Sequence, residues 1–80
     1  MKTYTYRIII EPDGKSFHGY VPALPGCHTF GRTIPETRKH IKDAISTYIQ
    51  SLIDDKEFIP EDKSFESFET VTFPLVRTYA

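Results

Sequence analysis

The stretch 21–36 constrains the backbone more than any other part of the chain, because it holds three of the six prolines and two of the four glycines. Pro22 and Pro25 have no backbone N–H, so they end a strand or lie on a sheet edge. Pro25-Gly26 is typical of a tight turn, since proline presets φ at the first corner and glycine accepts a positive φ at the second. The stretch therefore predicts the end of a strand, a tight turn, a short strand over 27–30 and the start of a helix.

A long amphipathic helix is predicted from Ile34 to Asp54 or Asp55. Thr33 and Glu36 have the spacing of a capping box, in which threonine accepts from the amide three residues on and glutamate reaches back. The apolar residues that follow recur at steps of three and four and form one stripe along the helix. The stripe consists of Ile34, Ile41, Ala44, Ile45, Tyr48, Ile49, Leu52 and Ile53.

Three further segments read as strands because apolar and polar residues alternate in them: 3–10, 16–21 and 68–73. A Pro-Asp-Gly turn within 11–15 joins the first two into a hairpin. The element order is then β-β-β-α-β, an α+β fold. A right-handed crossover would place the last strand parallel to the first and beside it. We expect a four-stranded mixed sheet with one helix packed on one face.

Composition restricts the class of protein further. Eighty residues make one domain, and we expect a single domain over 1–80. A lone cysteine rules out an internal disulfide and fits a reducing cytoplasm. No apolar run approaches the roughly 20 residues that a membrane-spanning helix needs. We therefore expect a cytoplasmic protein that does not enter a membrane.

The same central stretch resembles a known family, the HicB-like antitoxins, and the resemblance covers about residues 4–60. The sequence VPALPGC, then G-x-T after a short strand, then an acidic residue and a helix, is similar to that family's pattern. Ala23 stands where an acid is common, Pro35 replaces one of an acidic pair, and Thr37 stands where alanine is usual. The matching residues are Phe17, Tyr20, Val21, Pro22, Leu24, Pro25, Gly26, Cys27, Gly31, Thr33 and Glu36.

The resemblance implies a fold, a function and a partner. The fold would be the truncated ribonuclease-H-like arrangement of the strands and helix described above. The chain would be the antitoxin of a toxin–antitoxin pair that binds a HicA-like mRNA-cleaving toxin and covers its active surface. Many relatives add a DNA-binding segment, but only eleven residues follow Glu69. We therefore expect no C-terminal DNA-binding domain and no direct contact with operator DNA.

Enzymatic and metal chemistry are not predicted. The three predicted N-terminal strands carry no acidic residue, whereas a two-metal nuclease needs converging carboxylates. Cys27 and His28 are adjacent on a strand and point to opposite faces, so they do not form a chelating or a nucleophile–base pair. We predict no catalytic residue, no metal site and no cofactor.

Charge is distributed unevenly along the chain. Residues 54–69 carry seven acidic side chains against two lysines, a net charge of −5, whereas the whole chain carries −1. Such a strip is either solvated loop or a docking surface for a basic protein, and the toxins of this family are small and basic. The candidate toxin-binding residues are Asp54, Asp55, Glu57, Glu61 and Asp62.

The sheet face opposite the helix carries a second predicted surface. One helix covers only one face of such a sheet, so apolar side chains on the other face suggest a contact. We expect a homodimer, formed through that face or through the tail, which would add to a neighbouring copy's sheet edge. The candidate residues are Ile9, Tyr20, Phe30, Leu75 and Val76. An alternative function is a stand-alone module that binds nucleic acid or a small ligand on this face, without a toxin partner.

Overall fold

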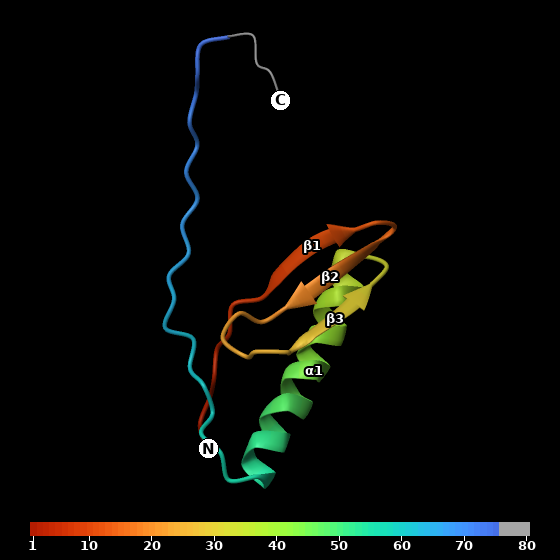
Figure 1. Cartoon of the computed structure of the whole chain (residues 1–80), viewed down its shortest axis with the longest axis vertical. Coiled ribbons are helices and arrows are strands. Elements are labelled where there is room, and N and C mark those ends of the chain that lie inside the picture. Colours follow the sequence, from red (N-terminus) through yellow and green to blue (C-terminus); the bar gives the residue numbers. More distant parts are fainter. Residues whose placement is uncertain (76–80) are drawn as a thin grey trace.

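A computed structural model describes residues 1–75 and shows a three-stranded sheet with one long helix packed on one face (Figure 1). The strands are β1 (Ile9–Asp13), β2 (Ser16–Tyr20) and β3 (His28–Gly31), and the helix is α1 (Ile34–Asp54). The strand order is β1-β2-β3, and both pairs are antiparallel. The predicted α+β class and the order of the first four elements are confirmed.

A two-residue turn sets the register of the β1–β2 hairpin. Asp13 pairs with Ser16 across Gly14-Lys15, and Gly14 has a φ of 61°. This backbone conformation costs a glycine little, and it matches the right-handed twist of the strands. The predicted loop 11–15 is therefore too long, because β1 continues through Pro12, which pairs with Phe17.

The predicted first strand, 3–10, is wrong over most of its length, because β1 begins only at Ile9. The hairpin register explains the late start. Ile9 pairs with Tyr20, the last residue of β2. Residues before Ile9 would therefore have to pair with Val21 and Pro22, where the chain bends away and proline has no amide to donate.

The predicted fourth strand, 68–73, is also wrong: within residues 1–75 no strand follows α1, and the sheet is antiparallel rather than mixed. Every residue from Lys63 to Leu75 is exposed. Figure 1 shows this segment as an extended trace that runs past the sheet without joining it. We call residues 64–75 the C-terminal arm.

The loop between β2 and β3 supplies most of the core. Val21, Leu24 and Cys27 are buried there and meet Ile41 of α1. Two successive turns fold the loop inward, with Leu24 N donating to Val21 O (3.0 Å) and Cys27 N donating to Leu24 O (3.0 Å). Gly26 has a φ of 80°, so the predicted Pro-Gly turn is confirmed. The partly buried residues around this core are Tyr6, Ile8, Ala44, Ile45, Tyr48 and Ile49.

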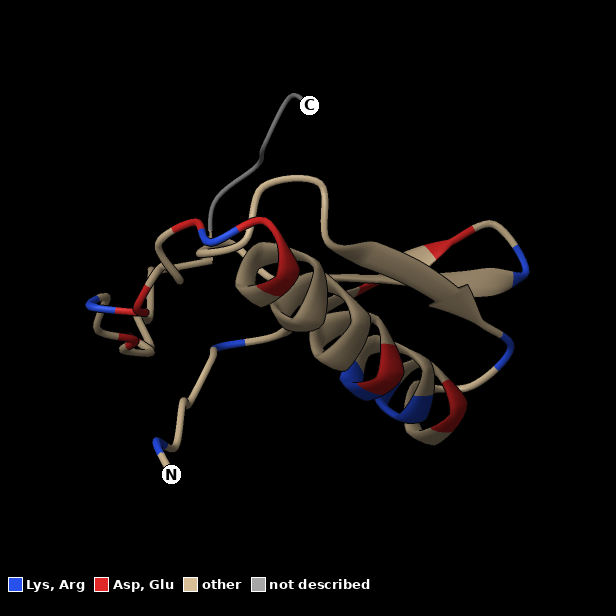
Figure 2. Cartoon of the chain, turned by 90° about the horizontal axis from the view of Figure 1, so that it is seen from below, with Lys and Arg blue, Asp and Glu red and all other residues tan. Residues whose placement is uncertain are grey.

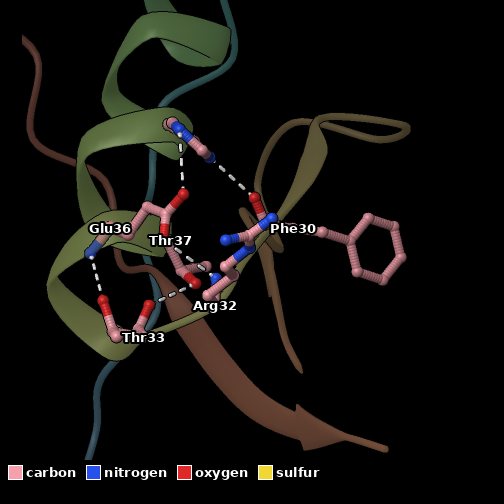
Figure 3. A network of polar contacts seen from close by, with 6 residues as sticks. Phe30, Arg32, Thr33, Glu36 and Thr37 are labelled. Atoms are coloured by element: carbon pink, nitrogen blue, oxygen red, sulfur yellow. Dashed lines mark hydrogen bonds and ion pairs between the residues drawn. The ribbon is translucent and has the colours of Figure 1, made fainter. Parts of the chain in front are cut away.

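The helix start follows the predicted capping box with one change. Thr33 Oγ1 accepts from Glu36 N (3.1 Å), while Glu36 Oε2 accepts from Arg32 N (3.1 Å), one residue before the cap (Figure 3). The middle of the predicted apolar stripe packs on the core. Its ends do not, since Ile34 and Ile53 are about half exposed.

Two glycines let the helix approach the sheet closely at Thr37, a fully buried polar residue. A Cβ on Gly19 would lie 2.8 Å from Thr37 Cγ2, and a Cβ on Gly31 would lie 2.7 Å from Thr37 N and 2.9 Å from its Cα. The Thr37 hydroxyl donates to Thr33 O (2.7 Å), so its burial leaves no unpaired donor.

Candidate protein-binding surfaces

The open face of the sheet carries a row of aromatic side chains. Gly19 faces α1, so its neighbours His18 and Tyr20 face the other way. The His18 ring lies 4.8 Å from that of Phe30, its partner on β3, and 5.3 Å from that of His28. Figure 3 shows the Phe30 ring pointing away from the helix. We call His18, Tyr20, His28 and Phe30 the aromatic row.

Three predicted contact residues meet on this face. Ile9 pairs with Tyr20 in the sheet, and Tyr20 lies two residues from His18, the partner of Phe30. Phe30 is about half exposed. His28 was missed as a member of the face, although its two-residue spacing from Phe30 predicts it. Of the other two predicted contact residues, Leu75 lies at the exposed end of the C-terminal arm and Val76 lies outside the described residues.

The predicted acidic candidates fall into two groups, and the first lies at the C-terminal end of α1. Asp54 is the last helical residue, Asp55 is the C-cap, and no basic residue stands in the last turn. The last carbonyls are satisfied by backbone amides, because Lys56 N donates to Ile53 O (3.1 Å) and Glu57 N donates to Leu52 O (2.9 Å). The acidic side chains are therefore not needed to end the helix.

Acidic side chains are also unfavourable at this position. The C-terminal end of a helix carries a partial negative charge, which disfavours carboxylates and favours lysine or arginine. Asp54 accepts a hydrogen bond from Gln50 Nε2 (2.9 Å). Within residues 1–75, however, none of Asp54, Asp55 and Glu57 has a salt-bridge partner. Figure 2 shows these acids at the end of α1 and in the chain that follows it. We call Asp54, Asp55 and Glu57 the acidic end.

The second group, Glu61 and Asp62, holds the N-terminal segment in place. Glu61 Oε1 pairs with Lys2 Nζ (2.9 Å), and the Tyr6 hydroxyl donates to Pro60 O (2.6 Å). Asp62 Oδ2 accepts from the Arg7 amide (2.8 Å). These contacts join residues 2–7 to residues 60–62, and we call them the clasp. The clasp already uses these two carboxylates, so a partner would have to compete for them.

Hydrogen bonds to the Asp62 carboxylate of the clasp lower its pKa. The Ser64 hydroxyl and the amides of Arg7 and Ser64 donate to Asp62, and they lower its pKa from the usual 3.8 to about 2. A carboxylate whose pKa is lower in the folded state stabilises the fold above its unfolded pKa and loses that contribution as pH falls through the folded value. The clasp is therefore expected to open between about pH 4 and pH 2.

Hydrogen exchange at the Arg7 amide, followed by NMR against pH, tests this expectation. Exchange, corrected for the intrinsic effect of pH, should accelerate as Asp62 protonates. The Val21 amide, which donates to Cys27 O in the core, should stay protected over the same range. In Asp62→Ala, which removes the acceptor oxygen, the Arg7 amide should exchange quickly at every pH. Equal protection of this amide in both proteins would show that the carboxylate does not hold the clasp.

Among the described residues, the remaining reactive side chains do not come together in a site. Burial raises the pKa of the Cys27 thiol. Within residues 1–75 no three His, Cys, Asp or Glu side chains lie close enough together to hold a metal ion. His40 Nδ1 lies 2.7 Å from Phe30 O, so its ring is tied to the edge of β3. No helix in the described part of the chain is long and apolar enough to cross a bilayer.

Fold and surface together define a small α+β domain whose exposed acidic and aromatic groups suit contact with another protein. The chain belongs to the HicB-like antitoxins: the family model described as the HicB-like antitoxin of bacterial toxin–antitoxin systems matches residues 6–72. The resemblance seen in the central stretch is confirmed, and the family is not enzymatic.

Several curated relatives are similar over most of their length. A UPF0150 protein of Thermoplasma acidophilum is 45% identical over 62 residues, which cover 76% of this chain and 90% of that protein. A UPF0150 protein of Synechocystis is 38% identical over 61 residues, which cover 74% of this chain and 76% of that protein.

Two solved structures share the fold. One is described as the HicA3 and HicB3 toxin–antitoxin complex, and its matching chain has a TM-score of 0.65 at 27% identity, with 75% of this chain and 70% of that chain covered. The other is the N-terminal domain of the Burkholderia pseudomallei antitoxin HicB, with a TM-score of 0.63 at 30% identity and coverage of 72% and 69%.

Proposed function

We propose that this chain is the antitoxin of a toxin–antitoxin pair, and that it neutralises a HicA-like mRNA-cleaving toxin by covering the toxin's active surface in the cytoplasm. Membership of the HicB-like family supports the antitoxin role. The similar HicB3 chain belongs to a structure described as a complex with the toxin HicA3, which supports the class of partner.

The acidic end is the single observation that carries the choice of surface. Its carboxylates stand at the negative end of α1, where they oppose the helix dipole and cap nothing. An arrangement that costs folding stability is explained if a cationic partner neutralises it. A basic toxin that places lysine or arginine side chains here would gain from both the carboxylates and the helix dipole.

Reversing the charge of the acidic end is therefore expected to slow association with the toxin. The variant Asp54→Lys, Asp55→Lys, Glu57→Lys should reduce the association rate about tenfold or more at low salt. The difference should shrink as salt rises, because the Debye length falls to about 8 Å at physiological ionic strength. Surface plasmon resonance with the co-expressed product of the neighbouring gene measures both rates.

A matched variant separates this local effect from net charge. The variant Glu11→Lys, Asp13→Lys, Asp43→Lys changes the net charge by the same amount, at the hairpin and the middle of α1, and should associate at nearly the wild-type rate. Equal slowing in the two variants would place the effect in overall charge. An unchanged rate in both would show that the acidic end is only solvated.

The aromatic row favours a second candidate function. Stacked and tilted rings such as His18 with Tyr20 and with Phe30 offer π-faces on which single-stranded bases can stack. On this alternative the chain is a nucleic-acid- or small-ligand-binding module without a toxin partner. Filter binding with labelled single-stranded RNA tests it, and retention that is lost in a His18→Ala, Phe30→Ala variant would support it.

Two finer predictions belong to the same proposal. We expect the free antitoxin to form a homodimer, and we expect it to make no direct contact with operator DNA. The apolar residues Ile9, Tyr20 and Phe30 on the open face, together with the exposed C-terminal arm, support the first expectation. Asp54, Asp55 and Glu57 support the second, because phosphate groups are repelled by such an acidic surface.

A further inference from the structure

The C-terminal arm exposes several large apolar side chains to solvent, which is unusual for a small folded protein. Phe65 and Phe68 are 95% and 87% exposed, and Phe73 and Leu75 are 77% and 103% exposed. Contiguous apolar surface of this kind usually marks a contact. The arm is also extended in the described structure, and its trace runs clear of its own sheet (Figure 1). The arm therefore lacks the partner that its side chains require.

The sequence of the arm is that of a strand with one apolar face. Val71, Phe73 and Leu75 alternate with Thr72 and Pro74, so the apolar side chains lie on one side of an extended backbone. Threonine and valine also have high strand propensity. Residues 69–75 thus have the pattern of a strand without a sheet, which is why they read as a fourth strand in the sequence.

The chain's own path leads the arm away from its own β1. Asp62 accepts from both the amide and the hydroxyl of Ser64, which is an Asx turn. This turn follows directly on the clasp, where Asp62 binds the Arg7 amide. The arm begins at that turn and runs clear of the sheet (Figure 1). For the arm to form a fourth strand on its own chain's sheet, the Asx turn at Asp62 would have to open.

Within residues 1–75, the sheet edge at β1 is more open to an added strand than the edge at β3. On β3, the carbonyl of Phe30 is already in contact with His40 Nδ1 of α1, at 2.7 Å (Figure 3). On β1, Pro12 pairs with Phe17 although it has no N–H, so its backbone groups point outward, away from β2. Ile10 shares that orientation, two residues earlier. The Ile10 amide and carbonyl and the Pro12 carbonyl therefore face the open edge.

Partly buried apolar side chains lie beside this edge. The helix packs mainly on β3 and β2 and reaches β1 least, so the β1 side of the covered face is less well shielded. Ile10 lies on that face, because its Cγ1 would be 3.7 Å from a Cβ on Gly19. Ile8 and, on the helix, Ile45 and Ile49 are only partly buried there. A strand added at β1 with its apolar face toward α1 would cover these side chains.

We propose that the C-terminal arm of one chain adds as a fourth strand to the β1 edge of a second copy, and that two copies exchange their arms reciprocally. Twofold symmetry makes each copy both donor and acceptor, so no arm is left over. Phe65 and Phe73 each bury roughly 150–250 Å² when enclosed. For two arms and the surfaces that receive them, the total exceeds the roughly 1,200 Å² of a specific interface.

Light scattering on the free full-length protein at micromolar concentration is the first test. We expect a mass of about twice the 9.3 kDa of one chain. The variant Val71→Glu, Phe73→Glu should give the mass of a single chain. The variant Thr70→Glu, Thr72→Glu adds the same charge to the opposite face of the strand and should stay dimeric. Matching far-UV circular dichroism in all three proteins would show that the domain itself remains folded.

Hydrogen exchange at the Ile10 amide locates the edge. It should be protected in the wild type and the threonine variant, and it should exchange at least tenfold faster in Val71→Glu, Phe73→Glu. Four outcomes would overturn the proposal. These are a monomeric wild type, a dimer that survives Val71→Glu, Phe73→Glu, protection at His28 and Phe30 instead of Ile10, and arm protection that arises only when a toxin is added.

Discussion

Replacing Leu24 with alanine is expected to reduce the free energy of unfolding by about 2–5 kcal/mol, because the side chain is fully buried between the β2–β3 loop and α1. A chain of this length has a total stability of roughly 4–12 kcal/mol. A single truncation in the loop can therefore remove a large part of the stability. Urea denaturation followed by circular dichroism measures the change.

The matched control for this prediction is Ile53→Ala, since Ile53 is 51% exposed at the end of the helix. This variant should change stability by about 0.5 kcal/mol or less. If Leu24→Ala were as mild as Ile53→Ala, the loop would be a surface feature. The core would then have to lie elsewhere between the sheet and the helix.

Adding a methyl group at either glycine under the helix is expected to destabilise the fold by about 1–3 kcal/mol, through overpacking against Thr37. The two sites should differ in how they respond to Thr37→Ala. At Gly19 the clash is with the Thr37 side chain, at 2.8 Å from Cγ2, so Thr37→Ala should relieve it. At Gly31 the clash is with Thr37 Oγ1 and also with the Thr37 backbone, at 2.7 Å from N and 2.9 Å from Cα, so Thr37→Ala should relieve it only in part.

Double-mutant cycles measure this difference. Gly19→Ala should become neutral or slightly stabilising in the Thr37→Ala background, because alanine also restricts the unfolded chain. Gly31→Ala should stay destabilising in both backgrounds, because its clash with the Thr37 backbone remains after the side chain is shortened. Equal rescue at both positions would mean that α1 moves as a body away from the sheet, and the close approach would then be adjustable.

Local sequence signals predicted the fold well where neighbours in the chain decide the structure. The capping residues Thr33 and Glu36 and the turn at Gly26 are examples, because each depends on residues within four positions. The start of β1 could not be predicted in this way. It is fixed by register across the hairpin and by the bend at Val21 and Pro22, which alternation in the first strand does not reveal.

The candidate surfaces, too, were predicted only where a local sequence pattern decides which residues come together. The period of two placed Ile9, Tyr20 and Phe30 on one face of the sheet, as the structure has them. The charge count, in contrast, grouped acids that the structure divides. Glu61 and Asp62 are hydrogen-bonded to residues more than fifty positions earlier in the chain. No local sequence pattern predicts such a contact.

The clasp also bears on the order in which the chain folds. The hairpin, the β2–β3 loop and the start of α1 form from contacts between near neighbours, whereas Lys2–Glu61 and Arg7–Asp62 close loops of 59 and 55 residues. Contacts between distant residues form late, because loop closure must come first. The N-terminal residues emerge first from the ribosome, but their contacts in the clasp can form only after residues 61 and 62 have been synthesised. In the native protein the same contacts should be the first to open, since both tie down a segment outside the sheet and the Lys2–Glu61 pair is exposed.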